Sequence, residues 1–294
     1  PVMATTVEAK KLYNFLLENV DTKTISGMMA NVAWNHTCAD QVNEWTGKYP
    51  AINGFDYVHM AASKAGADWI NYKDITPVQE WADNNGIVQL MWHWNVPKNE
   101  PTTTLDPNKD YDFYVKSDGY PDGTTFDPSN ALKEGTWENE VWKNDMATLK
   151  EYLTLLKNAN IPVLWRPFHE ASGKWFWWGA KDAATFKTLW IEMFNELKEA
   201  GLDNLIWVWT SCGKDDDWYP GDAYVDIVAR DLYGDKAETC ASEFATLGST
   251  YGNKIVTLGE CGYSTSTKKQ IATLSEQNEK GAKWSWFMVW YNDE

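Results

Sequence analysis

One pattern of hydrophobic and polar positions repeats along the chain: an amphipathic helix, a glycine or asparagine, a short apolar strand, and then a polar or aromatic loop. Glycine and asparagine suit the helix ends because helices commonly finish with a left-handed residue. Strands that are apolar on both faces and alternate with helices indicate a buried parallel sheet. The predicted strands are residues 25–28, 52–55, 87–92, 161–165, 205–209, 225–229, 255–258 and 284–290.

Start signals place the helices between these strands. Thr76, followed by Pro77 and Gln79, predicts an N-cap, a first-turn proline and a capping-box partner. Asp182 is predicted to cap a helix that runs to about residue 200. Further helices are predicted over residues 6–19, 138–158, 238–251 and 266–280. Eight strand–helix units in 294 residues favour a closed (β/α)8 TIM barrel, an α/β fold in a single domain over residues 1–294, rather than an open doubly wound sheet.

Two segments fit this pattern less well. Residues 98–136 are rich in Thr, Pro, Asp, Gly and Asn and predict one long loop after the third strand. A loop of this length is usually functional, here as a rim beside a cleft, or it marks a misassigned element. The chain also ends directly after the eighth strand, so the N-terminal helix is the candidate for the eighth place in the outer ring.

Charge and composition narrow the partners. The 42 acidic residues outnumber the 26 basic ones and give a net charge of −16. Such a surface repels phosphate backbones and anionic lipid, so we expect no nucleic-acid partner and no membrane insertion. No apolar run approaches the ~20 residues that span a bilayer, and no signal peptide is visible. A neutral substrate and a monomeric protein are expected.

The aromatic content points to a sugar ligand. The chain has 19 Trp, 14 Tyr and 10 Phe, and several of them fall in runs such as residues 92–94 and 175–178. A packed core does not need consecutive indoles, whereas sugar rings stack their C–H faces on aromatic planes. We therefore interpret these runs mainly as ligand-binding surface rather than as core.

Other chemistries find little support. Cys38, Cys212, Cys240 and Cys261 show no C-x-x-C spacing, and they are free or form one disulfide. His169-Glu170 begins like a zincin motif, but residue 173 is Gly where the second His belongs. Neither a G-x-S-x-G elbow nor a nucleotide-binding P-loop is present. We expect no metal and no cofactor.

Two glutamates follow predicted strands at the end where barrels build their active sites. Glu170 follows the fourth strand and Glu260 the seventh, both in apolar surroundings where an unneeded carboxylate is costly. Either one alone suits a solvated loop position. As a pair, they match the two carboxylates of glycoside hydrolysis, one protonated and one ionised.

The segments around both glutamates resemble a known family. Residues 166–179, Arg-Pro-Phe-His-Glu-Ala-Ser-Gly-Lys-Trp-Phe-Trp-Trp-Gly, are similar to the acid/base signature of glycoside hydrolase family 26, most of whose members are β-mannanases. Residues 258–262, Leu-Gly-Glu-Cys-Gly, are similar to its nucleophile segment. Weaker similarities are found at residues 25–27, 50–56, 92–94, 231–233 and 286–290, nearly the whole chain. The chain departs from the family in lacking a final helix after the eighth strand.

The resemblance implies roles for individual residues. Glu170 becomes the acid/base and Glu260 the nucleophile of a retaining double displacement on β-1,4-mannosidic bonds. Tyr233 matches a tyrosine that orients the nucleophile, or it is a half-buried barrel aromatic. Arg166 holds Glu260 ionised, or it forms a structural ion pair. The substrate-binding candidates are His93, Arg166, His169, Trp175, Trp178, Tyr233 and Trp290, with His169 positioned to hold the acid or a sugar hydroxyl.

The implied substrate is a β-mannan polysaccharide or a manno-oligosaccharide. Such a substrate implies a secreted, periplasmic or cell-surface protein that acts on hemicellulose. Hydrolysis of another β-glycan, such as xylan or mixed-linkage glucan, stays open, as does a non-catalytic glycan-binding barrel. The retained carboxylate pair and Tyr233 argue against the last alternative, because binding alone needs only the tryptophans.

Overall fold

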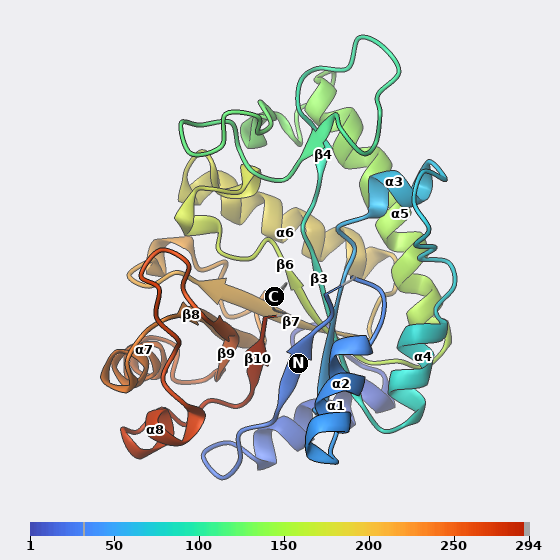
Figure 1. Cartoon of the computed structure of the whole chain (residues 1–294). Helices are drawn as coiled ribbons and strands as arrows, with labels where there is room; N and C mark the ends of the chain where they lie inside the picture. Colours follow the sequence, from blue (N-terminus) through green and yellow to red (C-terminus); the bar gives the residue numbers. More distant parts are fainter. Residues whose placement is uncertain (32, 291–294) are drawn as a thin grey trace.

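The computed structural model describes residues 1–31 and 33–290 and forms a closed barrel of eight parallel strands (Figure 1). Around the barrel the strand order is β1-β10-β9-β8-β7-β6-β3-β2. The strands are β1 (Gly27–Met29), β2 (Ile52–Asp56), β3 (Ile87–Trp92), β6 (Val163–Pro167), β7 (Leu205–Ser211), β8 (Ile227–Tyr233), β9 (Ile255–Gly262) and β10 (Phe287–Val289). This architecture confirms the predicted (β/α)8 barrel, and each predicted strand overlaps an observed one.

Helices surround the barrel, but not one per strand. They are α2 (Thr37–Thr46), α3 (Met60–Lys64), α4 (Thr76–Asp83), α5 (Trp137–Asn158), α6 (Ala183–Glu199), α7 (Ala237–Thr250) and α8 (Leu274–Glu279). Between β7 and β8 the chain forms only the short 3-10 turn η4 (Asp216–Trp218). Helices α2 and α3 were not predicted, and the helix predicted over residues 266–280 was wrong in its first half. There, α8 begins after Thr273, which forms a capping box with Glu276.

Two predicted helix starts have different outcomes. Asp182 is the N-cap of α6, and its side chain accepts a hydrogen bond from the Thr185 amide, as predicted. Thr76 is not an N-cap: it is the first residue of α4 and its side chain caps nothing. Instead, the Asp74 carboxylate accepts hydrogen bonds from the Thr76 amide and hydroxyl. The acceptor therefore lies two residues earlier than predicted.

The N-terminal helix α1 (Val7–Glu18) covers the barrel interior instead of completing the outer ring. Its buried residues Ala9, Leu12 and Leu16 belong to the same apolar cluster as the inward-facing residues of the strands. That cluster includes Ile25, Ile52, Leu164, Ile206, Ile227 and Ile255, which lie at or near the strand starts. The helix thus closes the N-terminal end of the barrel, away from the strand ends expected to carry the site.

The segment predicted as a long loop after the third strand is mostly irregular. It carries a small antiparallel pair, β4 (Val96–Pro97) with β5 (Tyr111–Asp112), and the 3-10 turn η1 (Pro128–Asn130). In Figure 1 this segment rises above the barrel around β4. Its Val115 amide donates to the Trp175 carbonyl, so the segment packs beside the loop that follows β6.

Most tryptophans are core, so our interpretation of the aromatic runs was wrong for the greater part. Trp92, Trp94, Trp177 and Trp178 are all at most 2% exposed. Trp92 and Trp94 stack at 3.9 Å between ring centroids, and Trp94 packs against Trp142 of α5 at 5.2 Å. All four cysteines are free. Among the residues described, no helix is long and apolar enough to cross a membrane.

Candidate active site

The candidate site lies at the carboxyl ends of the strands, and both predicted glutamates reach it. Glu260 is on β9, and Glu170 follows β6 directly before the 3-10 turn η2 (Ala171–Gly173). The backbone is strained at this point, because Phe168 and Glu170 have positive φ angles of 51° and 54°. Such conformations are uncommon for residues other than glycine and cluster at functional sites.

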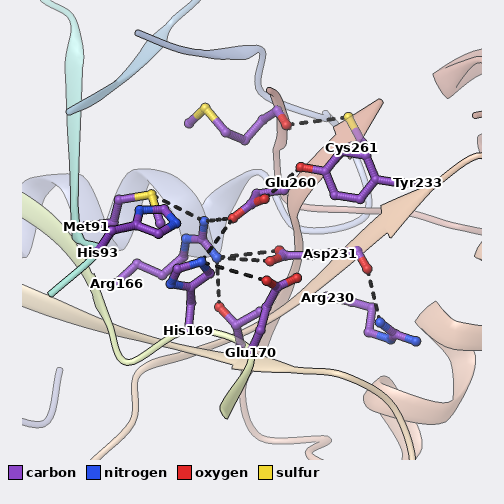
Figure 2. Close-up of polar contacts among 12 residues, drawn as sticks. Met91, His93, Arg166, His169, Glu170, Arg230, Asp231, Tyr233, Glu260 and Cys261 are labelled. Carbon is purple, nitrogen blue, oxygen red and sulfur yellow. Dashed lines mark hydrogen bonds and ion pairs between the residues drawn. The ribbon is translucent and has the colours of Figure 1, made fainter. Parts of the chain in front are cut away.

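Three carboxylates converge here (Figure 2). One oxygen each of Glu170, Asp231 and Glu260 lies within 4.8 Å of the other two. Glu260 is 6% exposed at its side chain and Asp231 1%, whereas Glu170 is 18% exposed. Glu170 is thus the member of the group that is most accessible from solvent.

Arg166 supplies the positive charge that this group requires. Its guanidinium is fully buried and donates through Nη2 to Glu260 Oε2. Through Nη1 it donates to the Thr210 hydroxyl at 3.0 Å and lies 3.3 Å from Asp231 Oδ2. A buried arginine that touches two carboxylates holds both in place and favours their ionised forms. Arg166 therefore forms ion pairs with both Asp231 and Glu260, a contact that suits either of the two roles predicted for it.

Tyr233 lies on the other side of Glu260. Its hydroxyl donates to Glu260 Oε1 at 2.6 Å, so the two carboxylate oxygens accept from two different partners. Burial and the neighbouring Glu260 charge raise the pKa of Tyr233, so the phenol keeps its proton to donate. Two bonds at fixed positions set the orientation of the Glu260 carboxylate.

The carboxyl groups differ in what stabilises their charge. Burial raises the pKa of Glu170 to about 7, and the nearby Glu260 charge adds to this effect. Burial and Asp231 also raise the pKa of Glu260 to about 7, against the hydrogen bonds from Arg166 and Tyr233. Because these two strong donors favour the anion of Glu260, we assign the ionised form to Glu260 and the proton to Glu170. Burial raises the pKa of Asp231 to about 7 as well, while Arg166 lowers it.

The two histidines form one edge of the site. His169 is 1% exposed, and its Nε2 lies 3.8 Å from both Glu170 Oε1 and Glu260 Oε2. Burial, together with His93, lowers the pKa of His169 well below its ordinary range, so its ring is neutral. The ring of His93 lies edge-on to the ring of His169, with 4.5 Å between their centroids. The Asp56 carboxylate holds His93 in place. Its Oδ1 accepts from the His93 amide at 2.9 Å, and its Oδ2 lies 2.5 Å from His93 Nδ1.

The structure separates the three tryptophans predicted to stack on sugars. Trp175 is half-buried beside Glu170. Trp290 is also half-buried and lies 5.9 Å from the His93 ring, where it lines a cavity of about 220 Å³ with Asp56 and Tyr114. Trp178 was predicted to stack on a sugar, but it is only 1% exposed. Its Nε1 donates to the His169 carbonyl, so it supports His169 from the protein interior.

Comparison with known proteins agrees with this geometry. The family model described as glycosyl hydrolase family 26 matches residues 3–294. The chain belongs to glycoside hydrolase family 26.

Individual relatives share this barrel. A mannan endo-1,4-beta-mannosidase of Thermothelomyces thermophilus is 33% identical over 96% of this chain and 55% of its own length. The family 26 domain of an endo-beta-mannanase/endo-beta-glucanase of Prevotella bryantii is 45% identical, with a TM-score of 0.91 over 99% of this chain and 90% of that one. A beta-mannanase from a symbiotic protist of the termite Reticulitermes speratus, complexed with gluco-manno-oligosaccharide, is 36% identical, with a TM-score of 0.81 over 100% of this chain and 87% of that one. The chain spans about half the length of the curated relatives it matches.

Sequence reasoning missed several residues of this family 26 site. Asp56 ends barrel strand β2 and Asp231 lies two residues before the end of β8, so their position in the repeat was the available signal. Tyr114 lies in the segment after β3, which showed no periodicity from which to place it. Its ring stacks on Phe176 at 5.3 Å and on Tyr120 at 3.9 Å, and this stack forms one wall beside the histidines.

Proposed function

We propose that this chain hydrolyses internal β-1,4-mannosidic bonds of mannan, galactomannan or glucomannan with retention of anomeric configuration. The closeness of the carboxylates carries the proposal: one oxygen of Glu170 lies within 4.8 Å of one oxygen of Glu260. Retaining glycosidases hold their two carboxyl groups about 5–5.5 Å apart, whereas inverting enzymes need about 6.5–9.5 Å to admit a water.

In the first step, Glu260 attacks the anomeric carbon while Glu170 protonates the departing glycosidic oxygen. The bond from carbon to the leaving oxygen breaks, a glycosyl ester forms on Glu260, and the Glu170 proton leaves with the released sugar. Arg166 and Tyr233 hold the Glu260 carboxylate for this attack through its two oxygens. A Glu170 pKa of about 7 keeps a large protonated fraction near neutral pH.

In the second step, water replaces the ester. Burial still raises the pKa of Glu170, but once Glu260 is esterified it carries no charge, so the part of the rise that came from its charge is lost and that pKa falls. Glu170 then takes a proton from the attacking water, whose oxygen bonds to the anomeric carbon on the face that the first leaving group occupied. Breaking of the ester restores both glutamates to their starting protonation states.

The choice of substrate is supported by the relatives and by charge. Curated relatives at about 30% identity are mannan endo-1,4-beta-mannosidases, and one solved relative was complexed with gluco-manno-oligosaccharide. A neutral polysaccharide is unaffected by the net charge of −16 on this chain. The His93 edge and the half-buried Trp175 and Trp290 offer the polar and flat apolar contacts that a pyranose ring requires.

The test is hydrolysis of a panel of mannan, galactomannan, xylan and mixed-linkage glucan. Activity is measured as the release of reducing ends and as the sizes of the products. We expect release of short oligosaccharides from the mannans only. Glu260→Ala should abolish it, and Glu238→Ala, at a surface glutamate in the first turn of α7, should not. Activity on xylan or glucan but not on mannan would overturn the substrate, and full activity of Glu260→Ala would overturn the mechanism.

We also propose that the protein acts outside the cytoplasm, as a secreted, periplasmic or surface-bound monomer that degrades hemicellulose. A polymeric substrate that cannot cross a membrane supports this location. Fractionation of the source cells followed by immunodetection of the protein tests it, and recovery in the cytoplasmic fraction alone would contradict it.

A further inference from the structure

A second cavity lies on the flank of the barrel, between α2 and α4. Its volume is about 530 Å³, and its walls include His36, Asp40, Tyr49, Glu80 and Trp81. This volume lies within the usual range of about 300–1,000 Å³ for small-molecule sites. None of its lining residues belongs to the candidate active site.

The cavity is separated from the active site by the height of the barrel. Pro50 and Ala51, which line it, directly precede β2, and Gly86 directly precedes β3. These are the amino ends of the strands, whereas Glu170 and Glu260 lie at the carboxyl ends. A strand of five or six residues spans roughly 17–20 Å, so a ligand here does not occupy the catalytic cleft.

Two aromatic rings form a corner in this cavity. Tyr49 is 55% exposed, and its ring meets Trp81 at 77° with 5.9 Å between centroids. Trp81 forms the floor: its Nε1 donates to the Ile87 carbonyl at 3.0 Å. A Cβ at Gly86 would lie 2.4 Å from this indole, so only glycine at position 86 lets the ring lie flat against the backbone.

Polar groups stand at fixed positions above the rings. His36 bridges two helices, because its Nδ1 lies 3.0 Å from Asp40 of α2 and its Nε2 lies 3.0 Å from Glu80 of α4. The imidazole packs on Trp81 at 5.8 Å. The side chains of Asp40 and Glu80 are 41% and 58% exposed, so both carboxylates retain oxygens that can accept from a ligand.

This chemistry selects a neutral, hydroxyl-rich ligand. Exposed Tyr49 offers a flat apolar face, and the Asp40 and Glu80 oxygens accept hydrogen bonds from hydroxyl groups. The carboxylates repel anions. They attract cations weakly, because each already pairs with a His36 ring nitrogen at 3.0 Å. Burial lowers the pKa of His36, but the hydrogen bonds that its ring donates to Glu80 and Asp40 outweigh this effect and raise that pKa.

We propose that this flank cavity is a second binding site for the β-linked glycan chain that the active site cleaves. It holds the polymer against the protein while the cleft acts on another part of it. The identity of the polymer rests on the proposed function, whereas the cavity and its chemistry do not. Short oligosaccharides, which fill the cleft alone, gain nothing from it.

The test compares retention on insoluble mannan with cleavage of a short soluble substrate. Retention is measured in a Glu260→Ala background so that the polymer stays intact, and cleavage of mannopentaose is measured with Glu260 in place. Tyr49→Ala should lower retention roughly threefold to tenfold, as for one stacked ring, and leave mannopentaose kcat/KM unchanged. Glu80→Gln, which keeps the side-chain size, should lower retention in the same direction.

Matched controls are available in Trp45→Ala and Trp69→Ala. These indoles are 72% and 75% exposed but do not line the cavity, so their removal should leave retention unchanged. Tyr49→Ala that binds mannan like its parent, with an unaltered Tm, would overturn the site, as would an equal loss in Trp45→Ala. If wild-type protein fails to cleave mannopentaose and mannan, the proposed function fails and the identity of the polymer fails with it. Cleavage combined with unaltered retention of Tyr49→Ala overturns the cavity proposal alone.

Discussion

Replacing Glu170 with glutamine should stabilise the protein at alkaline pH, because the native state then no longer buries this charge. The carboxyl has a pKa of about 7 in the folded chain, against an ordinary value of 4.5. The difference of about 2.5 pH units, at ~1.4 kcal/mol each, corresponds to ~3 kcal/mol. This is an upper bound, because Asp231 and Glu260 share the same buried charge and relax when it is removed.

The sign follows from proton binding. Since the folded state holds this proton more tightly than the unfolded chain, the contribution to stability is fully present below about pH 4.5 and is lost as the pH rises through about 7. Glutamine has no proton to lose, so Glu170→Gln should match the wild type near pH 4.5 and exceed it at pH 8. For 294 residues, ~3 kcal/mol corresponds to a rise in Tm of up to about 5 °C.

The assay is thermal unfolding of both proteins from pH 4.5 to 8.5, with Glu238→Gln as a control at an exposed glutamate whose side chain is 59% exposed. A difference in Tm between wild type and Glu170→Gln that grows with pH supports the buried, raised carboxyl. Parallel curves for the two proteins, or the same pH-dependent gain in Glu238→Gln, would refute the reasoning.

Three further outcomes are expected from the same contacts. Tyr233→Phe removes a hydrogen bond to the Glu260 anion, so kcat on mannan should fall about tenfold or more. Because the anion loses a donor, the acid limb of the pH profile of kcat/KM should move to higher pH, and an unmoved limb would contradict the orienting role. Trp178→Ala should destabilise the barrel by about 3–5 kcal/mol, seen in chemical denaturation, because this indole is 1% exposed; near-native stability would contradict its place in the core. Trp175→Ala, at a half-buried ring beside Glu170, should instead lower kcat/KM on mannan, with a smaller loss in Tm than Trp178→Ala. A larger loss in Tm for Trp175→Ala than for Trp178→Ala would contradict the assignment of Trp175 to the cleft and Trp178 to the core.

The fold was predictable from sequence because its signal is periodic. Strands β3 and β7 are apolar on both faces, and glycine or asparagine separates most strands from the preceding helix, so both element type and order could be read directly. The helix ends were less predictable, because the decisive contact at α4 is an Asp74 side chain two residues before the first helical turn. The short α3 carries too few residues to show a helical period.

The site was predictable where it follows strand ends and hidden where it depends on three-dimensional packing. Glu170, Glu260, Arg166 and Tyr233 all lie on or directly after barrel strands, and the structure brings them together. Which tryptophan faces the cleft could not be predicted, because Trp175 and Trp178 belong to one irregular loop whose turns decide their directions. Neighbouring tryptophans in the sequence therefore do not show which ring is buried, as Trp178 is, and which is partly exposed, as Trp175 is.

The most direct test of the central claim is the stereochemistry of the first product. Proton NMR of a β-1,4-manno-oligosaccharide during the first minutes of hydrolysis shows the anomer before mutarotation. If Glu260 is the nucleophile and lies within 4.8 Å of Glu170, as its oxygen does here, the new reducing end should appear first as the β-anomer. An initial α-anomer would mean inversion, and Glu260 would then activate a water instead of bonding to the sugar.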